Sequence, residues 1–373
     1  MHVGLNLIFL VPGETGGMEV AARELVPALR DAAPGTRFTA FVGRAGAGVD
    51  LGVESVVVPV DATNRVQWVR GEQQLLPPLA RRHGCDVVHS LASTAPARGR
   101  FARVVTIYDL NYLVVPEAHF GLRALGMRVL VPLAARTSHR VIAVSEATQR
   151  DLVERLRVPS DRIDVVPLGL GRIADVAATP EATLRERLGL GSRPVVLSLS
   201  AKRPHKNLRG LLDGLARIEP QHRPVLVLPG YPTPHEAELR RHAEAIGVAG
   251  DLRFEGWTSD ADVEGLFDIA SAFAFPSFYE GFGLPVLEAM TRGVPVVCSD
   301  RASLPEVAGN AALLFDPSDP AAIAAALERV LEDPREAERL RAAGRAQAAR
   351  FTWTATANGT LASYERALRS AAP

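Results

Sequence analysis

The chain is poor in cysteine and carries no net charge, and each shortage excludes a class of protein. Its 373 residues include only Cys85 and Cys298, too few for a disulfide framework and typical of a reducing compartment. Lys+Arg and Asp+Glu are both 42, which argues against a bulk nucleic-acid binder. No apolar run approaches the length of a membrane span, and the N-terminus lacks the charged start and cleavage site of a signal peptide. These absences predict a cytoplasmic globular protein.

Motifs of several enzyme classes are also missing. The sequence has no Walker loop, no His-Glu-x-x-His and no complete Gly-x-Gly-x-x-Gly, and the last absence argues against a nicotinamide-dependent oxidoreductase. Asp260 and Asp262 have the Asp-x-Asp spacing that other sugar transferases use for a metal. Because they follow Ser259 and precede an apolar-periodic segment, they are interpreted as a helix cap and first turn. The sequence therefore predicts no metal site and no cofactor.

Short apolar stretches alternate with longer amphipathic ones, which is the pattern of parallel α/β sheets. The length suffices for two domains with separate cores. We predict a first domain over residues 1–172, a linker and entry helix over 173–192, a second domain over 193–352 and a last helix over 353–373. The predicted strands include residues 3–11, 56–60, 86–89, 104–107, 195–199, 225–228, 251–254, 270–275 and 294–298.

The stretch from Pro276 to Met290 has the clearest functional pattern. It follows the apolar strand predicted over 270–275, and Gly281 and Gly283 let a loop bring its backbone close to a ligand. Pro285 suits the first turn of the helix that follows. A strand, a glycine loop and a helix N-terminus together suit an anion such as phosphate.

Two glutamates, Glu280 and Glu288, flank this glycine loop. Because carboxylates repel phosphate, these side chains are expected to accept hydrogen bonds from hydroxyl groups instead. Phosphate beside hydroxyl groups predicts a sugar nucleotide. An ordinary strand–helix junction with two solvated glutamates is the alternative.

Lysine is confined to one loop of the chain. Of the 42 basic residues only Lys202 and Lys206 are lysines, and both lie between the strand predicted over 195–199 and a helix predicted over 208–218. Their amines and the dipole of that helix reinforce each other on an anion. The loop, in which Asn207 follows Lys206, is therefore a second candidate phosphate site.

The first domain offers candidates at its strand ends, because ligands of parallel sheets bind beyond the carboxyl ends of the strands. Gly16 and Gly17 stand in the turn between the first strand and the first helix, where an ordinary turn is the alternative. Polar residues that follow later strands are His89, Ser90, Tyr108, Asp109 and Asn111. A lone histidine at a strand end is more often structural than catalytic.

The segment 122–140 is apolar and punctuated by arginines. Such a segment can lie on an anionic membrane surface. We favour a helix that packs on the sheet with its arginines in water, and weak membrane-surface contact is the alternative.

Residues 276–290 resemble the Glu-x7-Glu motif of the retaining family 4 glycosyltransferases of the GT-B fold, which use nucleotide-sugar donors. Segments 254–257, 293–297 and 304–309 are similar to that family too. The resemblance covers nearly the whole chain, most specifically residues 194–317. Many relatives carry His-Asp where this chain has Tyr108-Asp109. The family's role can therefore be carried over to Asp109 more readily than to Tyr108.

The resemblance implies an α/β GT-B fold, with two Rossmann-like domains facing an interdomain cleft and the C-terminal helix crossing back to the first domain. It implies catalytic roles for Asp109, Glu280 and Lys206, with His89, Tyr108 and Asp109 on the acceptor side. The implied donor-binding residues are Gly16, Gly17, Lys202, Lys206, Asn207, Glu280, Gly281, Phe282, Gly283, Leu284 and Glu288. Among these, the lysines would bind the diphosphate, Glu280 the sugar hydroxyls and Glu288 the ribose.

The expected activity is metal-independent transfer of a hexose from a nucleoside-diphosphate sugar, with retention, to a sugar, lipid-linked glycan or small-molecule acceptor. The expected partners include no nucleic acid, and the expected location is cytoplasmic, with peripheral contact at the inner membrane face as an alternative. A non-catalytic nucleotide-sugar-binding protein is the rival function. Only Tyr108, in place of histidine, favours it.

Overall fold

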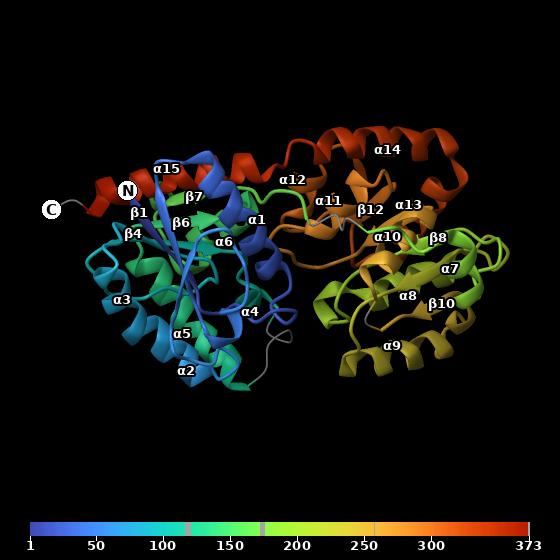
Figure 1. The fold of residues 1–373 in the computed structure, drawn as a ribbon. Coiled ribbons are helices and arrows are strands. Elements are labelled where there is room, and N and C mark those ends of the chain that lie inside the picture. The colour runs from blue at the N-terminus through green and yellow to red at the C-terminus, as the bar shows by residue number, and fades with distance from the viewer. Residues whose placement is uncertain (116–120, 172–175, 257, 372–373) are drawn as a thin grey trace. The chain divides into compact units, whose positions relative to one another are not determined.

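A computed structural model describes residues 1–115, 121–171, 176–256 and 258–371, with the side chains of 121–125 outside the description. The chain forms two compact units (Figure 1). The first unit comprises Met1–Gly169 together with Phe351–Pro373, and the second comprises Leu170–Arg350. Each unit has its own parallel sheet, so the predicted α/β fold class with two Rossmann-like domains is confirmed.

The first unit contains a seven-stranded parallel sheet with the order β3-β2-β1-β4-β5-β6-β7. Its strands are β1 His2–Leu7, β2 Arg37–Val42, β3 Glu54–Val57, β4 Val87–Ser90, β5 Ala102–Ile107, β6 Arg140–Ala143 and β7 Ile163–Val165. Its helices are α1 Gly17–Ala32, α2 Arg65–Arg70, α3 Leu76–Arg82, α4 Asn111–Val114, α5 Gly121–Thr137, α6 Glu146–Leu156 and α15 Trp353–Ala371. The strand order reverses between β1 and β4, so the carboxyl ends of these two strands mark the place where such a sheet opens to a ligand.

The second unit contains a six-stranded parallel sheet with the order β10-β9-β8-β11-β12-β13. Its strands are β8 Val195–Leu197, β9 Val225–Leu228, β10 Leu252–Phe254, β11 Ala272–Phe275, β12 Val296–Ser299 and β13 Ala312–Phe315. Its helices are α7 Glu181–Arg187, α8 Leu208–Arg217, α9 Pro234–Ala245, α10 Asp260–Ile269, α11 Leu284–Thr291, α12 Leu304–Ala308, α13 Pro320–Glu332 and α14 Pro334–Ala348. Here the order reverses between β8 and β11.

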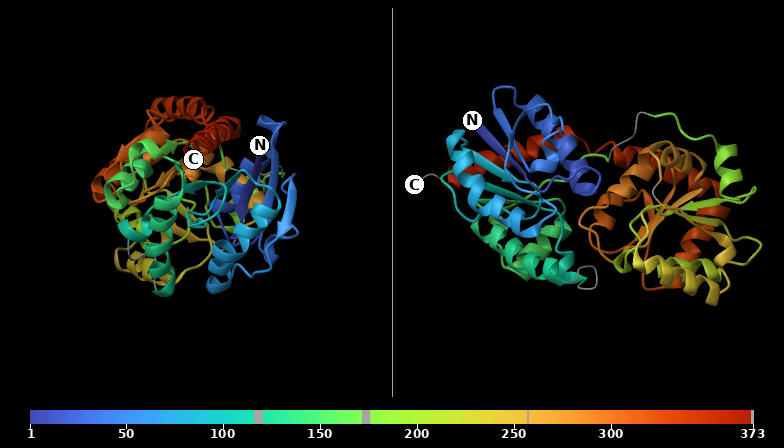
Figure 2. Two further views of the ribbon diagram at one scale, coloured as in Figure 1. Left: turned by 90° about the vertical axis from the view of Figure 1, so that its left-hand side faces the viewer. Right: turned by 60° about the horizontal axis from the view of Figure 1, so that its bottom comes forward.

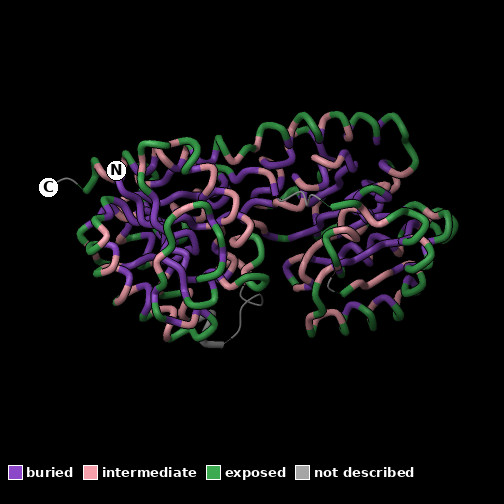
Figure 3. The backbone as a smooth tube through the Cα atoms, in the orientation of Figure 1, coloured by how far each residue is buried: buried purple, intermediate pink, exposed green. Residues whose placement is uncertain are grey.

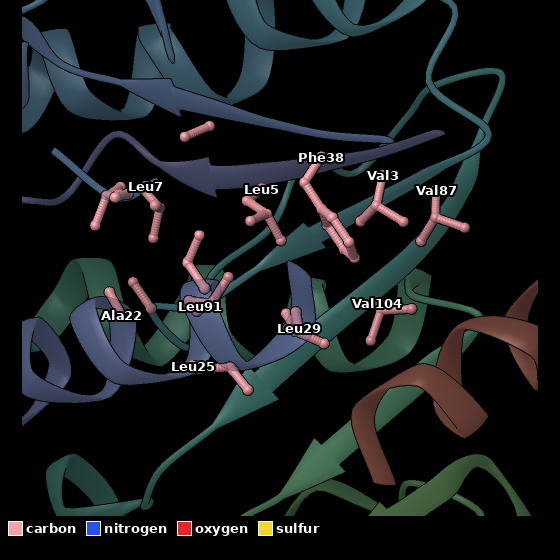
Figure 4. Close-up of a cluster of buried hydrophobic side chains, with 14 of the residues drawn as sticks. Val3, Leu5, Leu7, Ala22, Leu25, Leu29, Phe38, Val87, Leu91 and Val104 are labelled. Carbon is pink, nitrogen blue, oxygen red and sulfur yellow. The ribbon is translucent and has the colours of Figure 1, made fainter. Parts of the chain in front are cut away.

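Apolar side chains cover both faces of the first sheet, as a parallel sheet requires. Alternate residues of β1, Val3, Leu5 and Leu7, pack with Leu25 and Leu29 of α1 (Figure 4). The opposite face packs on α3 through a second buried cluster. Buried residues accordingly follow the strands, whereas exposed residues follow the outer helices (Figure 3).

The C-terminal helix α15 belongs to the first unit, where it lies beside the sheet and α1 (Figure 2). Tyr364 is fully buried, and its hydroxyl lies 2.7 Å from Nδ1 of His89. The Asp164 carboxylate of β7 pairs with Arg140, lies 3.0 Å from the Arg366 guanidinium of α15, and accepts a hydrogen bond from Ser363. These buried polar contacts fix the last helix on the sheet that the first part of the chain forms.

Helix α5 packs on the first sheet through Val131, Ala134 and Ala135. Its other face exposes Val129 and Leu133. Packing of the arginine-rich segment on the sheet, the favoured alternative, is therefore found for the part of the helix that the structure describes. None of the helices in the described ranges combines the length and the hydropathy that crossing a membrane requires.

Candidate functional site

The candidate site lies where the strand order of the second sheet reverses. The loop 198–207 follows β8, and the loop 276–283 follows β11, its neighbour in the sheet. The backbone N–H of Phe278 donates to the carbonyl oxygen of His205 at 2.9 Å, so the two loops touch. Since ligands of open α/β sheets bind at this point, the fold brings the two predicted phosphate loops together.

Lys206 and Glu280 form an ion pair across these loops. Nζ of Lys206 lies 2.6 Å from Oε1 of Glu280, and the two side chains are only 17% and 13% exposed. The same amine lies 5.4 Å from the centroid of the Phe275 ring, which adds a cation–π contact. The chain thus sets a cation and a carboxylate side by side in a place with little water, 74 residues apart in sequence.

Asn207 holds the lysine loop in place. Its Oδ1 accepts from the backbone N–H of Gly210 at 3.2 Å and so caps α8. Its Nδ2 donates to the carbonyl oxygens of Pro276 at 3.2 Å and Pro317 at 2.7 Å. These contacts occupy both ends of a side chain that was predicted to bind the donor, so in this structure Asn207 acts as the support of Lys206.

Two backbone features make this position of Asn207 possible. Asn207 has φ +51°, a left-handed conformation that asparagine tolerates better than most residues. A methyl group on Gly210 would lie 2.7 Å from the Asn207 amide nitrogen, too close for the cap to form undisturbed. The Lys-Asn-x-x-Gly spacing therefore has a structural reason.

Lys202 occupies a different environment from Lys206. Its side chain is fully buried, and its amine donates to the carbonyl oxygens of Gly230 at 2.5 Å and Glu255 at 3.0 Å and lies 3.5 Å from the Glu236 carboxylate. Burial lowers the pKa of the amine, and Glu236 opposes that shift. This placement corrects the expectation of a direct diphosphate contact, because the amine joins the loops that follow β8, β9 and β10.

Arg203 is the basic residue that sequence reasoning passed over. It is only partly buried, and its guanidinium donates to the Tyr231 hydroxyl at 3.1 Å. Its position next to Lys202 is the one feature of the sequence that could have indicated a place in this loop. That feature is weak because arginine is so common in this chain.

The glycine loop leads directly into α11. Gly283 has φ +116° at the position before the helix, and a methyl group there would lie 2.8 Å from Leu304. The buried Ser303 hydroxyl lies 3.0 Å from the carbonyl oxygen of Glu280 and 2.7 Å from that of Phe282. Ser303, which the sequence did not indicate, therefore fixes the backbone of Gly281 and Phe282 just before Leu284 begins the helix.

Glu288 lies one turn into α11 and is partly buried. Burial raises the pKa of its carboxyl group to about 7, with the charge of Arg292 opposing this shift and that of Glu264 adding to it. Glu264 itself holds Arg292 through Nε at 2.7 Å. A methyl group on Gly171 would overlap the Glu288 carboxylate, so the backbone at Gly171 lies directly against it. Glu288 and Glu280 therefore differ sharply in surroundings.

In the first unit, Gly16 and Gly17 begin α1. Gly16 has φ +55°, and a methyl group added there would meet no atom within 4 Å, so its conformation rather than packing favours glycine. At the end of β5, the backbone N–H of Asn111 donates to Oδ1 of Asp109 at 3.0 Å. The neighbouring Tyr108 has a hydroxyl pKa raised by burial.

His89 is not at the surface expected of an acceptor-side residue. Its ring is fully buried, with Nε2 2.7 Å from the Thr106 hydroxyl and Nδ1 2.7 Å from the Tyr364 hydroxyl. Burial lowers the pKa of the imidazole to about 3. The expected acceptor-side role is corrected accordingly: His89 fastens α15 to the sheet.

Ser259 caps α10, as predicted, by accepting from the backbone N–H of Asp262 at 3.1 Å. Asp262 also accepts from the Thr179 hydroxyl at 2.6 Å and pairs with Arg187 at 2.9 Å. Within the described ranges, no three His, Cys, Asp or Glu side chains gather in a geometry suited to a metal.

Comparison with known proteins identifies the family. Residues 15–170 match the model "Glycosyltransferase Family 4", and residues 181–347 match "Glycosyl transferases group 1". The O-antigen chain mannosyltransferase B of Escherichia coli is 34% identical over 265 residues, which cover 70% of each chain. The chain is a member of glycosyltransferase family 4.

Further similarities extend over nearly the whole family 4 chain. A D-inositol 3-phosphate glycosyltransferase of Frankia alni is 30% identical over 381 residues, covering 97% of this chain and 87% of its own. The solved structure of Anabaena Alr3699/HepE in complex with UDP-glucose has a TM-score of 0.74 at 22% identity and covers 97% and 100% of the two chains. The GT-B fold expected of this family is thereby confirmed.

The support that Asn207 gives to the lysine loop can be measured. Asn207→Asp keeps the oxygen that caps α8 but loses both amide donors, so two carbonyl groups lose a partner. We expect urea unfolding of the second unit to show a loss of about 1–3 kcal/mol for each carbonyl left unsatisfied. Asn207→Ala should lose the cap as well, about 0.5–2 kcal/mol more.

Asn64→Ala is the control for Asn207→Ala, because the Asn64 side chain caps α2 of the first unit. If Asn207→Asp unfolds at the same urea concentration as the wild type, the two carbonyl contacts do not support the loop.

Proposed function

We propose that this family 4 chain transfers a hexosyl group from a nucleoside-diphosphate sugar to an acceptor hydroxyl, with retention of anomeric configuration. The observation that carries the proposal is the ion pair of Lys206 and Glu280, which lies where the strand order reverses and beside the glycine loop that opens α11. A cation, a helix N-terminus and a carboxylate are complementary to the diphosphate and hydroxyl groups of one such donor.

The donor sugar is proposed from the named relatives. The similarity to an O-antigen chain mannosyltransferase makes a mannosyl donor the first to test, and the Anabaena structure in complex with UDP-glucose makes UDP-sugars the second. A thermal-shift panel of GDP, UDP and their sugars separates these, because a ligand that binds only the folded state raises its stability by mass action.

Lys206 and Glu280 have separable tasks in the proposed reaction. The donor diphosphate replaces Glu280 as the partner of the Lys206 amine, and the released carboxylate accepts hydrogen bonds from sugar hydroxyls. As the bond between the anomeric carbon and the phosphate oxygen breaks, negative charge grows on the diphosphate. A fixed cation and the N-terminus of α11 stabilise that charge. A new bond joins the anomeric carbon to the acceptor oxygen, and the proton of that hydroxyl passes to the departing phosphate oxygen.

Other residues are proposed to bind or support the substrates. The backbone of Gly281, Phe282 and Gly283 would contact the phosphate and sugar, with Leu284 at the start of α11. Glu288 would accept from the ribose hydroxyls, and Asp109 would contact the acceptor hydroxyl. Lys202 and Asn207 would act through the loop that they hold, without touching the donor.

The reaction is proposed to need no divalent metal, because the Lys206 amine and the N-terminus of α11 would already face the diphosphate. Asp262, the residue that an Asp-x-Asp metal site would use, pairs instead with Arg187 and Thr179. Turnover should persist in EDTA. A rate that disappears in EDTA and returns with manganese or magnesium would contradict this proposal.

The role of Lys206 predicts a large loss of rate on its removal. Lys206→Ala should lower turnover at saturating donor by roughly 10²-fold or more, as removal of one preorganised charge-stabilising donor does. Lys206→Arg should recover only part of the rate, because a planar guanidinium does not reproduce a compact ammonium group. Turnover is measured as nucleoside diphosphate release with acceptor present.

Arg217→Ala controls for the loss of a positive charge, because Arg217 is exposed at the far end of α8, the helix that Lys206 precedes. A folded Lys206→Ala protein that keeps more than about half of the wild-type turnover, a barrier change below roughly 0.5 kcal/mol, would overturn the assignment.

The raised pKa of Glu288 predicts a pH dependence of nucleotide binding. Only the ionised carboxylate accepts strongly from ribose hydroxyls. With a pKa of about 7, its ionised fraction rises steeply between pH 6 and 8, so the affinity for nucleoside diphosphate should rise up to about tenfold across that range. Calorimetric titrations at several pH values measure this rise.

The unliganded protein should show the opposite trend in stability. Because the folded pKa of Glu288 exceeds its ordinary value of 4.5, between about pH 4.5 and 7 the folded protein keeps a proton that the unfolded chain has released. The free energy of unfolding therefore falls as the pH rises through this range, and the loss is complete above pH 7. Glu288→Gln should remove both trends. An unchanged rise in affinity in that variant would assign the pH dependence to another group, such as the nucleotide phosphate.

A further inference from the structure

The reversal point of the first sheet encloses a buried polar cluster that the proposed reaction does not yet use. Asn6 of β1 and Ser90 of β4 are register partners at the carboxyl ends of the two strands, and Nδ2 of Asn6 donates to Oγ of Ser90 at 3.0 Å. The same Nδ2 donates to Oε2 of Glu72 at 3.3 Å. Glu72 is only 3% exposed.

A local feature of the helix brings Glu72 to this point. Helices α2 and α3 are continuous in the chain but are separated by a π-helical turn, Gly71–Leu75. A methyl group on Gly71 would lie 2.9 Å from Cγ2 of Val60, so glycine allows the turn to press against the sheet. Such turns are rare and are frequently found at functional sites.

Glu72 and Gln73 of this turn hold the loop 91–97 that follows β4. Oε2 of Glu72 accepts from the Thr94 hydroxyl at 2.7 Å. The Gln73 amide group donates to the carbonyl oxygen of Ala95 at 2.9 Å and accepts from the N–H of Ala97 at 3.0 Å. It also donates to Oε1 of Glu72 at 3.1 Å.

Within the described part of the chain, the Glu72 carboxylate accepts from three uncharged donors, Asn6, Gln73 and Thr94. Burial raises the pKa of the carboxyl group to about 7, although the hydrogen bonds oppose the shift. A group that only accepts satisfies all three donors, whereas a glutamine would turn its own N–H₂ group toward one of them. The cluster is therefore specific for a carboxylate at a position where burial makes one costly.

The same loop reaches the Tyr108-Asp109 segment. Ser93 has φ +62°, a strained conformation for serine, and its N–H donates to the carbonyl oxygen of Thr106 at 3.0 Å. Oγ of Ser93 accepts from the N–H of Tyr108 at 3.4 Å. On the other side, the Thr148 hydroxyl donates to the carbonyl oxygen of Tyr108 at 3.0 Å.

We infer that Glu72 is a positioning residue: its carboxylate holds the loop 91–97, and through Ser93 that loop sets the backbone of Tyr108 and Asp109, the segment proposed to meet the acceptor. The functional part of this inference rests on the proposed role of Asp109 toward the acceptor. The structural connection from Glu72 to Asp109 can be tested without any substrate.

Thr94→Val tests whether Glu72 holds the loop 91–97. It removes one donor to Glu72 and keeps the size of the side chain, so the shape changes little. Hydrogen exchange followed by mass spectrometry should show roughly tenfold or faster exchange in the loop 91–97 and in the segment around Tyr108 and Asp109. Peptides of the second unit should be unchanged. Gln73→Leu removes the contacts to Ala95 and Ala97 and should give the same pattern if Thr94→Val fails to fold.

Thr63→Val is the control, because the Thr63 hydroxyl donates to Asp61 at 2.7 Å in an exposed turn of the same unit. It should leave exchange at Tyr108 and Asp109 unchanged. Faster exchange confined to the loop 91–97, or none at all, would overturn the inference.

Turnover then separates a failure of this inference from a failure of the proposed function. With GDP-mannose as donor and methyl α-mannoside as acceptor, Thr94→Val should lower turnover roughly tenfold in the wild-type background and less than twofold in Asp109→Asn, since both changes act on one group. Equal losses in the two backgrounds would contradict the positioning role. An Asp109→Asn protein with wild-type turnover would contradict the proposed role of Asp109. Hydrogen exchange would then be the test of whether Glu72 positions the segment around Tyr108 and Asp109.

Discussion

The ion pair between Lys206 and Glu280 is the interaction on which the rest of the site depends. Two opposite charges lie 2.6 Å apart with little exposure to water, and each would be costly to bury alone. The pair holds the two loops at the reversal point of the second sheet in one arrangement. In the proposed reaction, an oxygen of the donor diphosphate would replace the carboxylate as the partner of the amine.

The surrounding residues make this arrangement rigid through hydrogen bonds to backbone carbonyl groups. Asn207 ties the lysine loop to Pro276 and Pro317, Lys202 joins the loops after three strands, and Ser303 holds the carbonyl groups of the glycine loop. Such second contacts matter because a misplaced charge stabilises a developing anion poorly. The first unit repeats the principle at its own reversal point, where Glu72 and Gln73 hold a loop that contacts the backbone of Thr106 and Tyr108.

Local sequence was sufficient to predict most of the strands, the glycine loop and the cap at Ser259, because these depend on neighbouring residues. It was insufficient where a side chain meets distant parts of the chain. Lys202 is enclosed by carbonyl groups 28 and 53 residues away, and His89 meets Tyr364 275 residues later. The helix Pro234–Ala245 and the edge strand Ala312–Phe315 were not predicted, because the helix is highly charged and the strand is half-exposed.

The most direct test of the exchange between Glu280 and diphosphate is calorimetric titration of GDP or UDP, whichever binds more tightly, into the wild type, Lys206→Ala and Glu280→Gln. The account predicts that Lys206→Ala weakens nucleoside diphosphate binding by roughly tenfold or more, the value of a charge-assisted hydrogen bond. Glu280→Gln should bind the nucleotide as tightly as the wild type or more tightly, because the amine no longer has a competing carboxylate. Equal weakening in both variants, or none in Lys206→Ala, would contradict it.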